Sequence, residues 1–175
     1  MQQEPNWQRL SALNDGDLQM SLLNWIDELM DGHYGEEEDT ILGGLRPPLN
    51  VMFLLNWLDF ELTQGSFLAY FLNSHGRHAR LAAQALKTIG AAKTASVLER
   101  AVGVFEANSA AWNARNEEMD QLEEFAVVRP YVGLPGADEL SDLTEKYWDA
   151  QRSDRYTDLL NDYFRRSVVE RAGGN

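Results

Sequence analysis

Apolar residues in this chain recur at the spacing of one helix face, and this periodicity most constrains what the chain can fold into. The face expected for residues 17–30 contains five of them: Leu18, Leu22, Trp25, Ile26 and Leu29. Asn14-Asp15, just before this segment, is typical of a helix N-terminus. Because no alternating pattern is longer than residues 126–128, no strand is expected. The sequence therefore predicts an all-α fold.

Further helical signals follow along the whole chain. The additional helices are expected at residues 49–63, 67–72, 77–89, 93–108, 110–125, 138–150 and 156–169. The acidic run Glu36-Glu37-Glu38-Asp39 lies among glycines and is predicted as a loop, and residues 127–136 are predicted as a connection. Since a chain of 175 residues is typical of one domain, residues 1–175 are expected to form a compact single-domain bundle of about seven to nine helices.

The net charge of −13 is unevenly distributed along the sequence. Residues 1–44 hold 10 acids and 1 base, and residues 105–149 hold 11 acids and 3 bases. Residues 45–104 hold 3 acids and 6 bases, and residues 150–175 hold 4 acids and 5 bases. A chain with this balance is a poor partner for DNA, RNA or anionic lipid, and it favours a basic protein partner.

The two acidic blocks supply the candidate partner-binding surface. Its members are Glu36, Glu37, Glu38, Asp39, Glu117, Glu118, Asp120, Glu123, Glu124, Asp138, Glu139, Asp142 and Glu145. In the helix expected after Trp112, Glu117, Asp120 and Glu124 follow the i, i+3, i+7 spacing of one face. The alternative is a solvated face that only aids solubility. Reversing Glu117, Asp120 and Glu124 to Lys separates the two, because only a binding surface loses its partner.

Candidate catalytic and metal-binding residues are few. The chain has no cysteine, and a metal site needs three or four ligands. His75 and His78 have no other His or Cys nearby in the sequence, few acids surround them, and His33 is the only other histidine. Ser66 lacks the second glycine of a nucleophile elbow. Asp59 and Glu61 can form a buried carboxylate pair with acid–base potential, although such residues more often cap a helix break. We therefore expect no metal, no cofactor and no enzymatic activity.

The N-terminus has neither a basic region nor an apolar stretch typical of a signal peptide, and no apolar run reaches 18 residues. The absence of cysteine suits a reducing compartment. The sequence therefore predicts a cytoplasmic protein without direct contact with a membrane.

Residues 55–92, LNWLDFELTQGSFLAYFLNSHGRHARLAAQALKTIGAA, resemble the signature of the bacterial DNA-mimic protein family, formerly a domain of unknown function. The family pattern is an acidic residue, N-G-G-F, then Y-F-x-N-S-x-G, and later A-L-x-x-I-G-A. The matching residues are Glu61, Gly65, Phe67, Tyr70, Phe71, Asn73, Ser74, Gly76, Ala85, Leu86, Ile89, Gly90 and Ala91. Gln64 replaces the usual Asn, and Ser66 replaces the second Gly. The resemblance covers roughly residues 49–166 and leaves an acidic N-terminal helix and loop, residues 1–48, outside it.

The signature is expected to be a structural corner of this helical fold. Gly65 allows the chain to break between two helices, and Asn73-Ser74 are expected to cap the turn before the next helix. Three aromatic residues are expected in the core: Phe67, Tyr70 and Phe71.

The resemblance implies an acidic homodimer that imitates duplex DNA. Such a protein would bind the DNA-binding face of a helix-turn-helix transcription regulator and block operator binding. A two-fold dimer would suit a dimeric regulator whose half-sites lie about 34–36 Å apart. The alternative is an antidote or immunity-type module that neutralises a basic toxin or nuclease by the same electrostatics.

Overall fold

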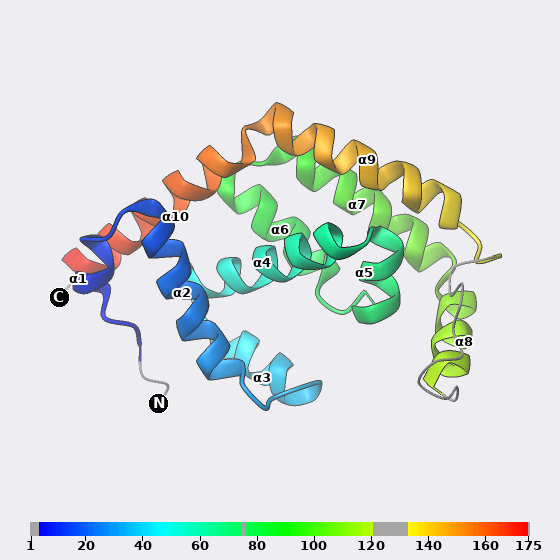
Figure 1. Ribbon diagram of the computed structural model, residues 1–175, viewed down its shortest axis with the longest axis horizontal. Helices are drawn as coiled ribbons and strands as arrows, with labels where there is room; N and C mark the ends of the chain where they lie inside the picture. The colour runs from blue at the N-terminus through cyan, green and yellow to red at the C-terminus, as the bar shows by residue number, and fades with distance from the viewer. Residues whose placement is uncertain (1–3, 75, 121–132, 175) are drawn as a thin grey trace. The chain divides into compact units, whose positions relative to one another are not determined.

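The computed structural model describes residues 4–74, 76–120 and 133–174. These residues form ten helices and no strand, which confirms the all-α prediction (Figure 1). The helices are α1 Trp7–Ser11, α2 Asp15–Met30, α3 Glu36–Gly44, α4 Leu49–Gln64, α5 Phe67–Ser74, α6 Ala79–Ile89, α7 Ala92–Ala107, α8 Ser109–Asp120, α9 Ala137–Asp154 and α10 Tyr156–Gly173. The chain divides into two compact units. Unit 1 contains the described residues up to Asn56 and those from Thr157 onward, and unit 2 is Trp57–Tyr156. A single domain stays a prediction.

Helices α1 and α3 were not expected from the sequence. The acidic run in α3 was predicted as a loop, and this was wrong because Glu36–Asp39 forms the first turn of the helix. Gly35, with φ 67°, turns the chain immediately before it. Carboxylates at a helix N-terminus interact favourably with the helix dipole, so the run that resembled a solvated loop favours the start of a helix.

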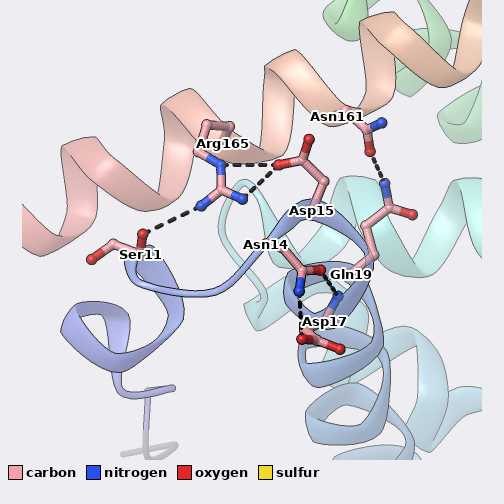
Figure 2. A network of polar contacts seen from close by, with 7 residues as sticks. All are labelled: Ser11, Asn14, Asp15, Asp17, Gln19, Asn161 and Arg165. Atoms are coloured by element: carbon pink, nitrogen blue, oxygen red, sulfur yellow. Dashed lines mark hydrogen bonds and ion pairs between the residues drawn. The ribbon is translucent and has the colours of Figure 1, made fainter.

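Unit 1 joins the two ends of the described chain through polar contacts on α2 and α10 (Figure 2). The Asn14 side chain caps α2 by accepting a hydrogen bond from the Asp17 backbone N–H at 3.0 Å. On α10, the Arg165 guanidinium donates to Asp15 Oδ1 at 2.5 and 3.1 Å and to the Ser11 carbonyl at 3.3 Å. Three residues of the predicted α2 face are almost fully buried: Leu18, Leu22 and Ile26.

Unit 2 is built around α7, which packs against both α6 and α9 (Figure 1). Aromatic rings fill the space between these helices and α5. The Phe71 and Phe105 rings stack with centroids 4.5 Å apart, and Trp112 of α8 meets Phe105 edge-on at 5.8 Å. Phe67 and Tyr147 form another edge-on pair at 5.5 Å, which joins α5 to α9. Offset and edge-on pairs of this kind add to the free energy gained by burial.

The family signature forms the corner between α4, α5 and α6, as expected. A Cβ atom at Gly65 would lie 2.5 Å from Ala69 Cβ, so only glycine lets the chain pass from α4 into α5 at this distance. The three predicted core aromatics, Phe67, Tyr70 and Phe71, are almost fully buried. The buried Glu61 carboxylate accepts a hydrogen bond from Asn73 Nδ2 at 2.9 Å, which joins α4 to α5.

The predicted capping role holds for Ser74 and not for Asn73. Ser74 Oγ accepts a hydrogen bond from the Gly76 backbone N–H at 3.2 Å, inside the turn. Asn73 lies in the last turn of α5, where its side chain is directed to Glu61 instead. Helix α6 then begins at Ala79 without a side-chain cap.

Replacing Gly76 by Ala is expected to lower the free energy of unfolding by about 2 kcal/mol. Gly76 has φ 69°, and an added Cβ would lie 2.7 Å from Cε1 of Phe105, a ring already stacked on Phe71. Chemical denaturation measures the change. Gly103→Ala is the matched control, because Gly103 lies within α7 with no atom within 4 Å of an added Cβ. That variant should be as stable as the wild type or more so. Equal stability of the two variants would contradict the role given to Gly76.

Candidate partner-binding surface

The outer face of α9 carries a row of carboxylates that we call the α9 stripe. Its members are Asp138, Asp142, Glu145 and Asp149, all exposed. Their i, i+4, i+7, i+11 spacing places them on one helix face over about 16 Å of helix axis. The buried residues Leu140, Leu143 and Tyr147 occupy the opposite face of the same helix. Helix α9 thus presents carboxylates outward while its apolar residues anchor it in unit 2.

Two polar contacts fix α9 within unit 2. The Phe67 backbone N–H, at the start of α5, donates to Thr144 Oγ1 at 3.0 Å, and both atoms are buried. Near the end of α9, Asp154 Oδ2 accepts from the backbone N–H and the hydroxyl of Thr94 at 2.8 and 2.9 Å. These contacts lie ten residues apart on α9, so they define its position along most of its length.

A half-buried carboxylate on α4 adds a third contact. Asp59 accepts hydrogen bonds from Tyr156 Oη at 2.7 Å, Gln151 Nε2 at 3.1 Å and Tyr147 Oη at 3.4 Å. Burial raises the pKa of Asp59 to about 6, and the three hydrogen bonds oppose that rise. Burial and the nearby Asp59 charge raise the pKa of Tyr147 and of Tyr156 well above the ordinary tyrosine value, so both phenols remain donors.

Several basic side chains of unit 2 are paired with carboxylates. The pairs are Arg80 with Glu106 and Lys87 with Glu99, each at 2.5 Å, and Arg100 with Glu139 at 2.6 Å. In the α9 stripe, Asp149 is paired with Arg152 of the same helix. Among the described residues, Asp138, Asp142 and Glu145 form no ion pair with a basic side chain, although Lys146 borders the stripe. These ion pairs involve three of the six bases in residues 45–104, whereas Asp138, Asp142 and Glu145 stay available.

The acids predicted on the preceding helix are described only in part. Glu117 is exposed on α8, and the Glu118 carboxylate lies 3.1 Å from Arg115 Nε. Asp120 is the last residue of α8. The Asp120 side chain, Glu123 and Glu124 lie outside the described residues, so the row of Glu117, Asp120 and Glu124 stays a prediction.

The remaining predicted acids, Glu36–Asp39, lie in unit 1. Glu36, Glu37 and Asp39 are exposed, and Glu38 is half-buried. Glu37 Oε2 lies 3.0 Å from Nδ1 of His33, in the turn before α3. Exposed acids of the predicted set therefore occur in both units.

The candidate catalytic residues have structural partners. Among the described residues, Asp59 and Glu61 belong to separate hydrogen-bond networks, since each carboxylate is bound by its own donors. Ser66 Oγ accepts from the Leu68 backbone N–H at 3.1 Å, which caps the start of α5. His78 is buried before α6, and His75 lies outside the described residues. Across the described ranges, no group of three or more His, Cys, Asp and Glu residues could hold a metal ion. Nor is any described helix long and apolar enough to cross a membrane.

The sequence did not indicate which residues bind Asp59 or which base pairs with Glu139. Tyr156 and Gln151 lie more than ninety residues after their acceptor Asp59, and Arg100 lies 39 residues before Glu139. No local spacing pattern connects such distant positions. The unusual occurrence of Asp59 in an apolar segment was the one available signal, and it indicated a buried carboxylate without indicating its donors.

The fold and the α9 stripe define an acidic, all-helical protein with a charged helix face directed outward. A sequence model of the DMP19-like proteins, named for DNA mimic protein 19, matches residues 43–167. The chain belongs to this family, which confirms the resemblance expected over roughly residues 49–166. Membership suggests a DNA-mimic role, and the family is generally non-catalytic. No curated protein and no solved structure matches the chain.

Proposed function

We propose that this chain is a non-catalytic DNA mimic that binds the DNA-binding face of a helix-turn-helix transcription regulator and blocks operator binding. The observation that carries this proposal is the α9 stripe, together with membership of the DMP19-like family. The stripe lies inside the matched region 43–167, whereas Glu36–Asp39 lies before it. We therefore assign the stripe, together with Glu117 of the preceding helix α8, as the main partner-binding surface.

Electrostatics support this assignment. A DNA-binding protein presents Lys and Arg at positions that meet phosphates, of which duplex DNA carries one per about 1.7 Å of axis. The α9 stripe has four carboxylates over about 16 Å of helix axis, which is a lower charge density than that of duplex DNA. Its carboxylates are, however, carried by a rigid helix. A helix held at Thr144, Asp154 and Asp59 keeps these charges in place before binding, so little ordering entropy is lost when the partner arrives.

The proposed protein acts as a homodimer in the cytoplasm. Two copies would present two stripes to a dimeric regulator that reads two half-sites. Light scattering of the purified protein tests the dimer separately from partner binding.

The test of the function is competition between this protein and operator DNA. The protein is immobilised, a lysate of the source organism is passed over it at low salt, and bound proteins are released by a salt gradient. We expect a basic helix-turn-helix protein to be released as salt rises, because charge–charge attraction is screened. The purified regulator should then leave its operator when this protein is added, in an electrophoretic shift assay.

Each contrary outcome has a distinct meaning. A released regulator that binds operator and this protein simultaneously would contradict mimicry. Release of a basic toxin or nuclease, inhibited by this protein, would instead establish the antidote function. Capture of neither would leave the α9 stripe as a solvated face and overturn the proposal.

A further inference from the structure

A hollow of about 510 Å³ lies at the junction of α2 and α3 in unit 1. Leu29, near the end of α2, and Ile41 of α3 give it apolar walls, and both are half-buried. Its polar lining comes from His33, Glu36, Glu37 and Thr40. A volume of this size lies within the range of about 300–1,000 Å³ typical of ligand pockets.

The charge at this hollow is predominantly negative. Glu36 and Glu37 are exposed in the first turn of α3, and none of the described residues that line the hollow is a Lys or Arg. His33 Nδ1 contacts Glu37 Oε2 at 3.0 Å, which leaves the other Glu37 oxygen and the Glu36 carboxylate for a guest. Thr40 Oγ1 donates to the Glu36 carbonyl, so the hydroxyl is already satisfied within the helix. The hollow thus combines apolar walls with two carboxylates at its rim.

We propose that this hollow receives an arginine side chain of a basic partner protein. The aliphatic stem would lie against Leu29 and Ile41, and the guanidinium would meet Glu36 and Glu37. Arginine suits this combination better than lysine, because its planar guanidinium is more weakly hydrated and can donate to two carboxylates at once. The inference rests on the proposed function for the identity of the partner, and it adds a second contact region on unit 1 to the α9 stripe on unit 2.

The experiment uses the whole protein and N-acetyl-arginine amide as the probe, followed by amide chemical shifts in ¹⁵N-labelled protein. We expect saturable shifts at Leu29, His33 and Ile41. N-acetyl-citrulline amide has the same shape without the charge, and it should give no saturable shift at the same concentrations. N-acetyl-lysine amide should bind more weakly than the arginine probe.

Two double variants make the test specific to the hollow. Glu36→Gln with Glu37→Gln should weaken arginine-probe binding about tenfold, since both carboxylates lose their charge. Asp162→Asn with Glu170→Gln, two exposed acids of α10, changes the net charge equally and should leave binding unchanged. Thermal unfolding confirms that all variants are folded.

Three results would each overturn the inference: equal binding of the citrulline probe, shifts confined to other residues, or unchanged binding in the Glu36 and Glu37 variant. Because this assay contains no regulator and no DNA, its outcome is independent of the operator competition. If the hollow binds the arginine probe but the protein does not displace a regulator from its operator, the proposed function is refuted and this inference is not.

Discussion

Reversing three carboxylates of the α9 stripe, as Asp138→Lys, Asp142→Lys and Glu145→Lys, is expected to weaken regulator binding by about 100-fold or more. Each carboxylate that meets a cation at the interface is assigned on the order of 1 kcal/mol, and 1.4 kcal/mol corresponds to a factor of ten. Three such losses give about 3 kcal/mol, and the new like-charge contacts add to it. Titration calorimetry or an operator-competition assay at fixed salt measures the change.

The fold is expected to survive this substitution. All three residues are exposed and lie opposite the buried face of α9. Lysine has at least as high a helix propensity as aspartate. The main cost arises at Asp138 in the first turn of α9, where a cation opposes the helix dipole by up to about 1 kcal/mol. Circular dichroism and thermal unfolding separate loss of fold from loss of binding.

A matched variant distinguishes position from total charge. Asp27→Lys, Asp162→Lys and Glu170→Lys changes the net charge by the same amount at exposed positions of unit 1. If binding depends on the geometry of the stripe, this control retains most of its affinity. Equal weakening in both variants would indicate a response to net charge only, and full binding by the α9 variant would remove the stripe from the interface.

The sequence predicted most helices because their apolar residues repeat at helical spacing. In α2, the four-residue spacing of Leu18, Leu22 and Ile26 corresponds directly to the buried face. Helix α3 lacks such a repeat, since four acids and two glycines leave only Ile41 and Leu42 as adjacent large apolar residues. Its start depends on the turn at Gly35 and on charge at the helix end, effects that a periodicity argument does not include.

The sequence likewise predicted only part of the candidate partner-binding surface. The spacing of Asp138, Asp142 and Glu145 follows from the sequence once α9 is known to be helical. Which neighbouring acid is neutralised does not follow, because the Arg100 that pairs with Glu139 comes from α7. Tertiary packing therefore removes Glu139 from the acidic block, whereas Asp149 is paired locally with Arg152 of the same helix.

Replacing Asp59 by Asn is expected to change how stability depends on pH. Burial raises the Asp59 pKa to about 6 from the ordinary value of 3.8, so the folded protein binds this proton more tightly than the unfolded chain. The stability that protonated Asp59 contributes is therefore fully present below about pH 3.8 and is lost as pH rises through about 6. The full shift corresponds to about 3 kcal/mol.

Measurements between about pH 5 and pH 8 avoid the isoelectric point near 4.5. Over that interval, this one carboxyl should lower the wild-type free energy of unfolding by about 1–2 kcal/mol. Asp59→Asn has no carboxyl to titrate at this position. Between pH 5 and pH 8, its free energy of unfolding should therefore fall by about 1–2 kcal/mol less than that of the wild type. Urea denaturation at several pH values gives the difference in slope, which does not depend on the absolute stability of the variant.

Tyr156→Phe tests the cause of the shift. The Tyr156 hydroxyl donates to Asp59 Oδ2 at 2.7 Å, and this hydrogen bond lowers the Asp59 pKa against the effect of burial. Removing it should raise the Asp59 pKa further. The free energy of unfolding should then continue to fall up to a higher pH than in the wild type. A smaller pH dependence in Tyr156→Phe, or an unchanged one in Asp59→Asn, would mean that Asp59 is hydrated in solution. In that case the Asp59 carboxylate would not lose hydration on folding, although its hydrogen bonds would still join α4 to α9.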